Sequence, residues 1–400
     1  MRVLLILAAS VYSLTGWIQL GLAQELPEVS GEHLHLRGSL TNSKLVFENS
    51  GKGHVAFIGG SITAMNGYRP MVSNFLQKRF PQTKFTFTDA GLSSTCSMTG
   101  AHRLTRDVLS RGNVDLIFIE FAVNDDQDAG HDAIHARRGM EGLLAQVRRH
   151  NPYADIVVTH FANQGMMNTI RAGEVPIPIL AHNQVCEHYQ VSTNDLCSEL
   201  TDLIDARKTT WELYGGVHPK PYGNSICTIL IKQLLERGWK SKVTEIVKHP
   251  VPIQPIDEQS YMNGRLVAPD RAVYDKSWKV SVPVWQELKG SFRSTYAGQK
   301  ALHGKTVGSE FSITFTGRSL GAFVLAGPDA GALEITVDDV KLQRGVNLYH
   351  RHSFSLHYPR TVMLAEGLEP GKHTVTVRIS PARDAQSHGS YARILNFTAN

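Results

Sequence analysis

The chain has 400 residues and a formal net charge of +5 at neutral pH. At about 150 residues per domain, this length predicts two or three domains. Because 42% of the residues are hydrophobic and only 19% are charged, the composition excludes a globally disordered chain. The 41 basic residues are scattered along the sequence, so no basic stripe indicates a nucleic-acid partner.

The first residues have the pattern of a secretory signal peptide. Arg2 precedes an uncharged apolar run that continues to residue 23 and contains small residues near its end. We therefore expect residues 1–23 to be removed before Gln24, which predicts a secreted or periplasmic protein without stable membrane insertion. An uncleaved anchor is the alternative, because the run is long enough to span a bilayer.

Between about residues 50 and 240, short apolar runs alternate with longer helical patterns. The predicted strands are residues 54–58, 85–88, 116–121 and 156–161, and the predicted helices are residues 69–79, 101–109, 131–150, 179–189 and 224–237. Met140, Leu143, Leu144 and Val147 show the helical spacing most clearly. Alternation of near-continuous apolar strands with helices predicts a parallel sheet covered on both faces.

The pattern changes after residue 248. Residues 249–258 hold three prolines, which predicts a linker between a first domain at residues 24–248 and a second domain at residues 259–400. In the second domain apolar and polar residues alternate in short runs, which favours a β-sandwich. The predicted strands there are residues 310–315, 321–325, 333–337, 373–379 and 392–398.

Four short segments of the first domain carry groups suited to ester hydrolysis. Ser61 follows the first strand behind two glycines, Gly91 follows the second, Asn124 follows the third, and His218 lies in a Gly/Pro loop before the last helix. Ligands of open parallel sheets bind at the carboxyl ends of the strands, so we expect these groups to meet. A hydroxyl nucleophile, two N–H donors and an imidazole base are the parts that acyl transfer needs.

At these residues the chain resembles the SGNH, or GDSL-like, hydrolase family over about residues 50–240. The resemblance implies that Ser61 is the nucleophile, that His218 is the base, and that Ser61, Gly91 and Asn124 form the oxyanion hole. It also implies a flavodoxin-like three-layer α/β/α sandwich and hydrolysis without a metal or cofactor. Residues 259–400 look like the jelly-roll modules that accompany carbohydrate-active esterases.

The chain departs from the family pattern at three positions. Gly60 replaces a common Asp beside the nucleophile, and Ala122 replaces a Gly of the third segment. At the position where the family usually has the Asp that orients the histidine, this chain has Gly215. Loss of that acid costs about four orders of magnitude in rate in well-studied triads. Three interpretations stay open: Glu212 replaces the acid, a backbone carbonyl holds His218, or the site binds without catalysing.

The sequence thus predicts a secreted serine esterase that removes small acyl groups, acetyl above all, from a poly- or oligosaccharide through an acyl-enzyme. One alternative is a lipase- or thioesterase-like acyl hydrolase, which needs an apolar acyl channel. Another is a carbohydrate-binding protein without activity, for which Gly215 is the argument.

Metal binding and disulfides are the remaining questions. One helix face could carry His131, Asp132 and His135, but no further ligand follows them at a recognisable spacing. No Cys-x-x-Cys pair occurs either, so we predict no metal site. Export permits disulfides, with buried free thiols as the alternative. Three pairings are possible among the four cysteines, which are Cys96, Cys186, Cys197 and Cys227.

Overall fold

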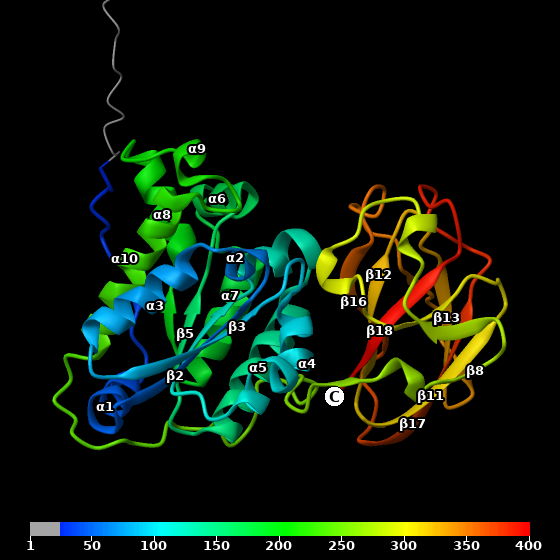
Figure 1. Cartoon of the computed structure of the whole chain (residues 1–400), viewed down its shortest axis with the longest axis horizontal. Helices are drawn as coiled ribbons and strands as arrows, with labels where there is room; N and C mark the ends of the chain where they lie inside the picture. The colour runs from blue at the N-terminus through cyan, green and yellow to red at the C-terminus, as the bar shows by residue number, and fades with distance from the viewer. Residues whose placement is uncertain (1–24) are drawn as a thin grey trace, which may run out of the picture.

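The computed structural model describes residues 25–400, so the predicted signal peptide lies outside the described residues. Within this part of the chain, no helix is both long enough and apolar enough to cross a membrane. The described chain forms an α/β part followed by a β part, which lie side by side (Figure 1).

A six-stranded sheet forms the centre of the α/β part. Its strand order is β1-β6-β5-β4-β2-β3, in which β2 to β6 run parallel and β1 pairs antiparallel with β6. Without β1, this order is that of a flavodoxin-like sheet, whose ligands bind where the strand order reverses, here beside β2 and β4. The bounds are β1 (Leu34–His35), β2 (Lys52–Gly59), β3 (Lys84–Gly91), β4 (Leu116–Glu120), β5 (Asp155–Thr159) and β6 (Ser192–Asn194).

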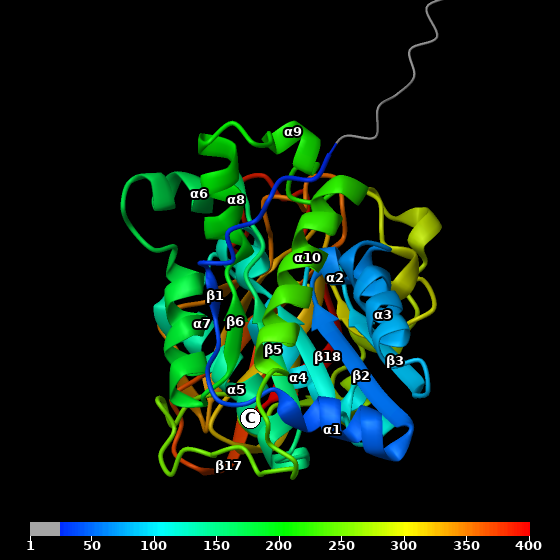
Figure 2. The same cartoon turned by 90° about the vertical axis from the view of Figure 1, so that its left-hand side faces the viewer.

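Helices cover both faces of this sheet, because side chains of its strands alternate between two apolar cores. On β2, Val55 and Phe57 join one core, whereas Ala56 and Ile58 join the other. The first core is covered by α1 (Thr41–Ser50), α3 (Tyr68–Arg79), α8 (Leu196–Asp205) and α10 (Pro221–Gly238), of which α10 crosses the front of the sheet in Figure 2. The second is covered by α4 (Ser97–Asp107), α5 (Ala133–His150) and α7 (Ile177–His188). The predicted three-layer fold is thereby confirmed.

Short elements gather at or near the ends of the sheet. They are α2 (Ser61–Ala64), the 3₁₀ turn η1 (Leu109–Arg111), the π-helix η2 (Asn124–Ala129), α6 (Gln164–Arg171) and α9 (Trp211–Tyr214). Of these, α2 and η2 directly follow β2 and β4, and they carry two of the predicted site residues.

The β part consists of two antiparallel sheets around a common apolar core, as the period-two pattern predicts. One sheet has the order β16-β12-β18-β10-β9 with β7 beside β18, and the other has β14-β13-β17-β11-β8 with β15 beside β13. The strands are β7 (Arg265–Val267), β8 (Val273–Tyr274), β9 (Trp278–Ser281), β10 (Ala301–Gly304), β11 (Glu310–Gly317), β12 (Leu320–Ala326), β13 (Ala332–Val337), β14 (Val340–Lys341), β15 (Val346–Asn347), β16 (Tyr358–Ala365), β17 (Gly371–Ile379) and β18 (Ala392–Ala399). Three 3₁₀ turns are η3 (Pro269–Arg271), η4 (Trp285–Glu287) and η5 (Ser294–Tyr296).

The prolines of residues 249–258 lie in a segment without helix or strand, but this segment is held against the first sheet and α5. His249 Nε2 lies 2.9 Å from Asp155 Oδ1. The backbone N–H groups of Ile256 and Asp257 donate to the buried carboxylate of Glu141, at 2.6 and 3.1 Å. The segment is therefore a fixed connection.

Two expectations about side chains are wrong. None of the four cysteines is paired in a disulfide; each is a buried free thiol. The sheet separates Cys197 and Cys227, which lie in the first core, from Cys96 and Cys186, which lie in the second. His131 does not share a helix face with His135, because Asp132 accepts a hydrogen bond from the N–H of His135 and so caps α5 after His131.

Candidate active site

The turn after β2 brings Ser61 to the carboxyl end of the sheet, as expected. Ser61 is the first residue of α2, directly after Gly59 and Gly60. A Cβ atom at Gly60 would lie 1.9 Å from Asn124 Oδ1, so the nucleophile turn and the Asn124 side chain are in close contact.

His218, which lies near the end of the first domain in sequence, contacts Ser61. The loop between α9 and α10 places His218 Nε2 2.8 Å from Ser61 Oγ. This is the distance of a normal hydrogen bond to a hydroxyl, and it allows Nε2 to accept the hydroxyl proton when the ring carries its own proton on Nδ1. A hydroxyl and an imidazole separated by 156 intervening positions in sequence thus form one pair.

The structure does not bring Glu212 to His218. Glu212 lies exposed on α9, and within residues 25–400 no carboxylate and no backbone carbonyl forms a hydrogen bond with His218 Nδ1. Position 215 itself has no room for the usual acid. Gly215 has a φ angle of +113°, and a Cβ there would lie 2.3 Å from the backbone N of Lys220.

The two other predicted donors also lie at the nucleophile turn, and each has an acidic neighbour. A Cβ at Gly91 would lie 2.3 Å from the backbone N of Ala64 in α2, so Gly91 is in close contact with that helix. The Gly91 N–H donates to Asp89 Oδ1 at 3.0 Å, and Asn124 Nδ2 donates to Asp128 Oδ2 at 2.6 Å. Since a side-chain amide carries two N–H groups, Asn124 keeps one for another acceptor.

Glu120 is a site neighbour that we did not predict. It ends β4, is fully buried, and its Oε2 accepts hydrogen bonds from Gly60 N at 3.2 Å and Thr63 Oγ1 at 2.9 Å. Burial raises the pKa of this carboxyl to about 8, so it is mostly neutral at pH 7. It therefore supports the nucleophile turn without placing a full negative charge beside it. The signal in the sequence is a single acidic residue inside the apolar run of residues 116–121.

A cleft of about 740 Å³ is lined by both parts of the chain and includes Val217, the residue before His218. Val217 contributes from the histidine loop, and His350 of the β part donates from its Nε2 to the carbonyl oxygen of Asp128 at 2.9 Å. The remaining polar lining residues include Asp126, Gln127, Asn163 and Gln164 of the first domain and Tyr349, Arg351 and Arg360 of the second.

The parallel sheet and the hydrogen-bonded Ser61–His218 pair at its carboxyl end define the class of this protein, which is a serine hydrolase with a flavodoxin-like fold. Residues 57–226 match the GDSL-like Lipase/Acylhydrolase family, and all four predicted site residues lie within this range. Residues 57–226 are therefore similar to a GDSL-like lipase/acylhydrolase domain, as the sequence resemblance implied.

Comparisons with solved structures show which proteins share this fold. Two crystal structures of a two-domain esterase (CEX) active on acetylated mannans, one co-crystallized with mannopentaose, each match 93% of this chain and 98% of their own with a TM-score of 0.72 and 19% identity. Axe2, an acetylxylan esterase from Geobacillus stearothermophilus, matches 48% of this chain and 97% of its own with a TM-score of 0.38 and 16% identity. No curated protein sequence matches the chain. The likeness to CEX extends over both domains.

Proposed function

We propose that Ser61 and His218 hydrolyse carboxylic esters through an acyl-enzyme. Ser61 Oγ attacks the ester carbonyl carbon while His218 Nε2 takes the hydroxyl proton, and the same nitrogen then protonates the departing alcohol oxygen. Water, activated by His218, attacks the acyl-serine and releases the acid. The single observation that carries this proposal is the 2.8 Å contact between Ser61 Oγ and His218 Nε2.

The oxyanion of each tetrahedral intermediate would be stabilised by the backbone N–H groups of Ser61 and Gly91 and by the Asn124 amide. Donors that already point to this place stabilise the developing charge without reorganising. The Gly91 N–H is shared with Asp89 in the structure, so the intermediate would compete with that carboxylate for the hydrogen.

We also propose that His218 works without a carboxylate partner, as a Ser–His dyad. The strained backbone of Gly215 excludes an acid at that position, and Glu212 lies exposed without a contact to the ring. A dyad retains the base and the oxyanion donors, which supply part of the acceleration on their own.

The proposed substrate is an acetylated poly- or oligosaccharide. CEX, which shares the two-domain fold, acts on acetylated mannans. The cleft that includes Val217 offers Arg351, Arg360 and Tyr349 of the second domain, and such donors suit sugar hydroxyls better than a long acyl chain. We further propose export of the protein, which rests on the N-terminal sequence pattern alone.

The variant Ser61→Ala tests the chemistry. It removes the attacking oxygen, so release of acetate from acetylated mannan or xylan should fall by at least about 1,000-fold. Acetate release by His218→Gln should fall by a similar factor. Ser225→Ala is the matched control, because its hydroxyl only donates to Pro221 O on the outside of α10. Unchanged acetate release by Ser61→Ala would refute the assignment.

The same assay separates the alternatives. A wild-type protein that binds acetylated mannan but releases no acetate from it is a binding protein without activity. Faster turnover of acyl chains of eight or more carbons than of acetyl esters indicates a lipase-like hydrolase instead. Each of these results would overturn the proposed function.

A further inference from the structure

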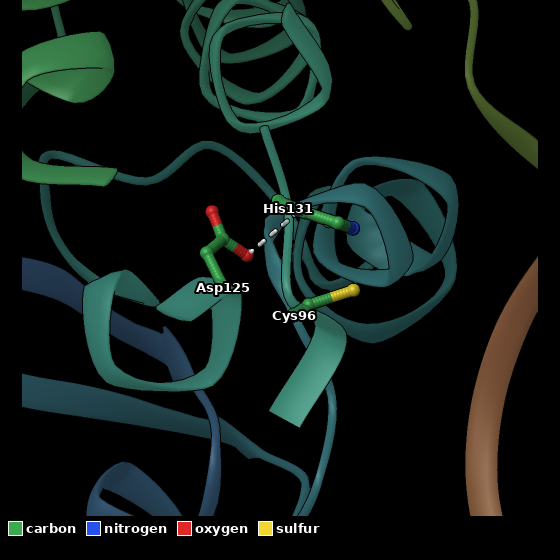
Figure 3. Close-up of side chains that lie close together, drawn as sticks. All are labelled: Cys96, Asp125 and His131. Atoms are coloured by element: carbon green, nitrogen blue, oxygen red, sulfur yellow. Dashed lines mark ion pairs between the residues drawn. The ribbon is translucent and has the colours of Figure 1, made fainter. Parts of the chain in front are cut away.

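A second cluster of reactive side chains lies outside the Ser61 site, where α4 and α5 face the β part. Cys96 directly precedes α4, Asp125 belongs to η2, and His131 lies in the loop before α5. One ligand atom of each residue lies within 4.8 Å of those of the other two. Figure 3 shows the three side chains close together, with Asp125 and His131 joined as an ion pair.

The spacing of this cluster fits metal coordination better than direct hydrogen bonding. His131 Nδ1 lies 3.4 Å from Asp125 Oδ1, and this buried nitrogen has no hydrogen-bond partner among the described residues. Ligands at the usual Zn–N and Zn–O bond lengths of a tetrahedral site are about 3.3 Å apart. An ion between these two atoms would therefore satisfy the nitrogen with little movement of either side chain.

The carboxylate of Asp125 is already oriented by other groups. His182 Nε2 lies 2.9 Å from Asp125 Oδ2, and the Ser97 N–H donates to Oδ1 at 2.8 Å. Asp125 and His182 are completely buried, so neither side chain can turn toward solvent. Metal-binding carboxylates commonly have such supporting hydrogen bonds, which hold the ligand in place before the ion arrives.

The cluster is accessible from one side. Cys96 and His131 line a second cleft of about 740 Å³ between the two domains, whose opposite wall is β16. The side chains of His135 and Glu366 line the same cleft. An ion held by three protein ligands would thus have a path of entry and room for a water or other small ligand in the fourth position.

We propose that Cys96, Asp125 and His131 form a binding site for a divalent ion of the zinc type, with its fourth position open to the interdomain cleft. A thiolate, an imidazole and a carboxylate suit Zn²⁺, whereas Mg²⁺ and Ca²⁺ select oxygen ligands only. The site is separate from the ester-hydrolase chemistry, which uses none of these three side chains.

Zinc binding by the purified protein tests this proposal. The metal-stripped protein is titrated with Zn²⁺ against a chromophoric chelator, and the Co²⁺-loaded protein is examined for thiolate-to-cobalt absorption in the near ultraviolet. We expect one tightly bound ion per chain and a cobalt–thiolate band. Cys96→Ser should abolish the band and weaken Zn²⁺ binding by at least about 100-fold.

The substitution Cys96→Ser should leave the fold unchanged. Cys96 occupies the N-cap position of α4, where serine is a preferred residue, so an unchanged unfolding midpoint would show that the loss is local. Cys186→Ser is the matched control, because Cys186 is equally buried but lies outside the cluster. His131→Gln should weaken Zn²⁺ binding as Cys96→Ser does.

Equal Zn²⁺ affinity in Cys96→Ser and the wild type would overturn the proposal, and so would a wild type that binds no ion. Ser61→Ala should bind Zn²⁺ as the wild type does. A wild-type protein that binds the ion but releases no acetate would refute the proposed esterase function and leave the metal site standing.

Discussion

Gly215 shows how one backbone position determines the composition of the active site. The chain turns there with a φ angle of +113°, and the space beside the Cα atom is filled by the backbone of Lys220. Neighbouring Gly216 also has a positive φ, of +85°, but no atom lies within 4 Å of where its Cβ would be. The turn that carries His218 is thus too tight to accommodate the family's acid at position 215.

These two glycines provide a matched pair of variants. Both Gly215→Ala and Gly216→Ala place an L side chain at positive φ, which costs about 1–2 kcal/mol. Only Gly215→Ala also forces a Cβ into the backbone of Lys220, so we expect its free energy of unfolding to fall by about 1–3 kcal/mol more. Thermal unfolding midpoints measure the difference.

Esterase activity should follow the same order, because His218 is three residues from Gly215 in the same turn. Equal midpoints for the two variants would show that the turn relaxes without cost. In that case the missing acid at position 215 would need another explanation.

At the scale of elements, α5 holds the connection between the two domains in place. Glu141 is fully buried on α5 and accepts hydrogen bonds from the N–H groups of Ile256 and Asp257 and, at 2.6 Å, from Ser260 Oγ. A helix residue thus supplies the acceptors that this proline-rich segment cannot obtain from a sheet or helix of its own.

The variant Glu141→Gln tests this role. Glutamine replaces one acceptor oxygen by an NH₂ group that faces donors, so the free energy of unfolding should fall by about 1–3 kcal/mol. Amide hydrogens of residues 256–260 should exchange faster with solvent, as mass spectrometry of peptides from this segment would show. Glu236→Gln is the control, since its exposed ion pair with Arg79 is worth at most about 1 kcal/mol. Unchanged exchange in residues 256–260 would contradict the argument.

In the whole molecule, polar side-chain contacts hold the two domains together beside the two clefts that both domains line. Glu366 directly follows β16 and receives Tyr261 OH at 3.1 Å and His135 Nε2 at 3.3 Å, while Thr361 on β16 contacts Thr99 on α4 at 2.8 Å. The hydrogen bond that His135 donates to Glu366 raises the pKa of His135 above its ordinary value. Protonation of one histidine thus affects how firmly the two domains are held together.

The stability contribution of this pair should depend on pH. Because the folded-state pKa of His135 is raised, its contribution is complete below the unfolded value of about 6.5 and is lost as the pH rises through the folded value. Glu366→Gln should therefore lower the unfolding midpoint more at pH 6 than at pH 9, by on the order of a few degrees. Calorimetry measures this, with Glu369→Gln on the same exposed loop as control. An equal loss at both pH values would contradict the role of His135.

Much of the fold is predictable from local patterns. The strands β2, β4 and β5 read as continuous apolar runs because both of their faces are buried, and β11, β13 and β17 alternate because one face meets the core. The short β6 was missed because three residues carry too little periodic signal. The helix α8 was also missed, although Leu196, Leu200 and Leu203 have the spacing of one buried helix face and could have predicted it. The segment of β16 was missed because Pro359 and Arg360 interrupt its alternation.

The place of Ser61 is predictable because strand ends of a parallel sheet meet at one edge. His218 follows no strand, and it was paired with Ser61 by its loop before the last helix and by the resemblance to the hydrolase family; the structure brings the two within 2.8 Å. The sequence patterns say nothing of what faces His218 Nδ1, of Glu120 behind the nucleophile turn, or of the Cys96, Asp125 and His131 cluster. Each of these depends on side chains from separate segments approaching within a few ångströms. Such distances follow from how helices and domains pack, which no local run of residues encodes.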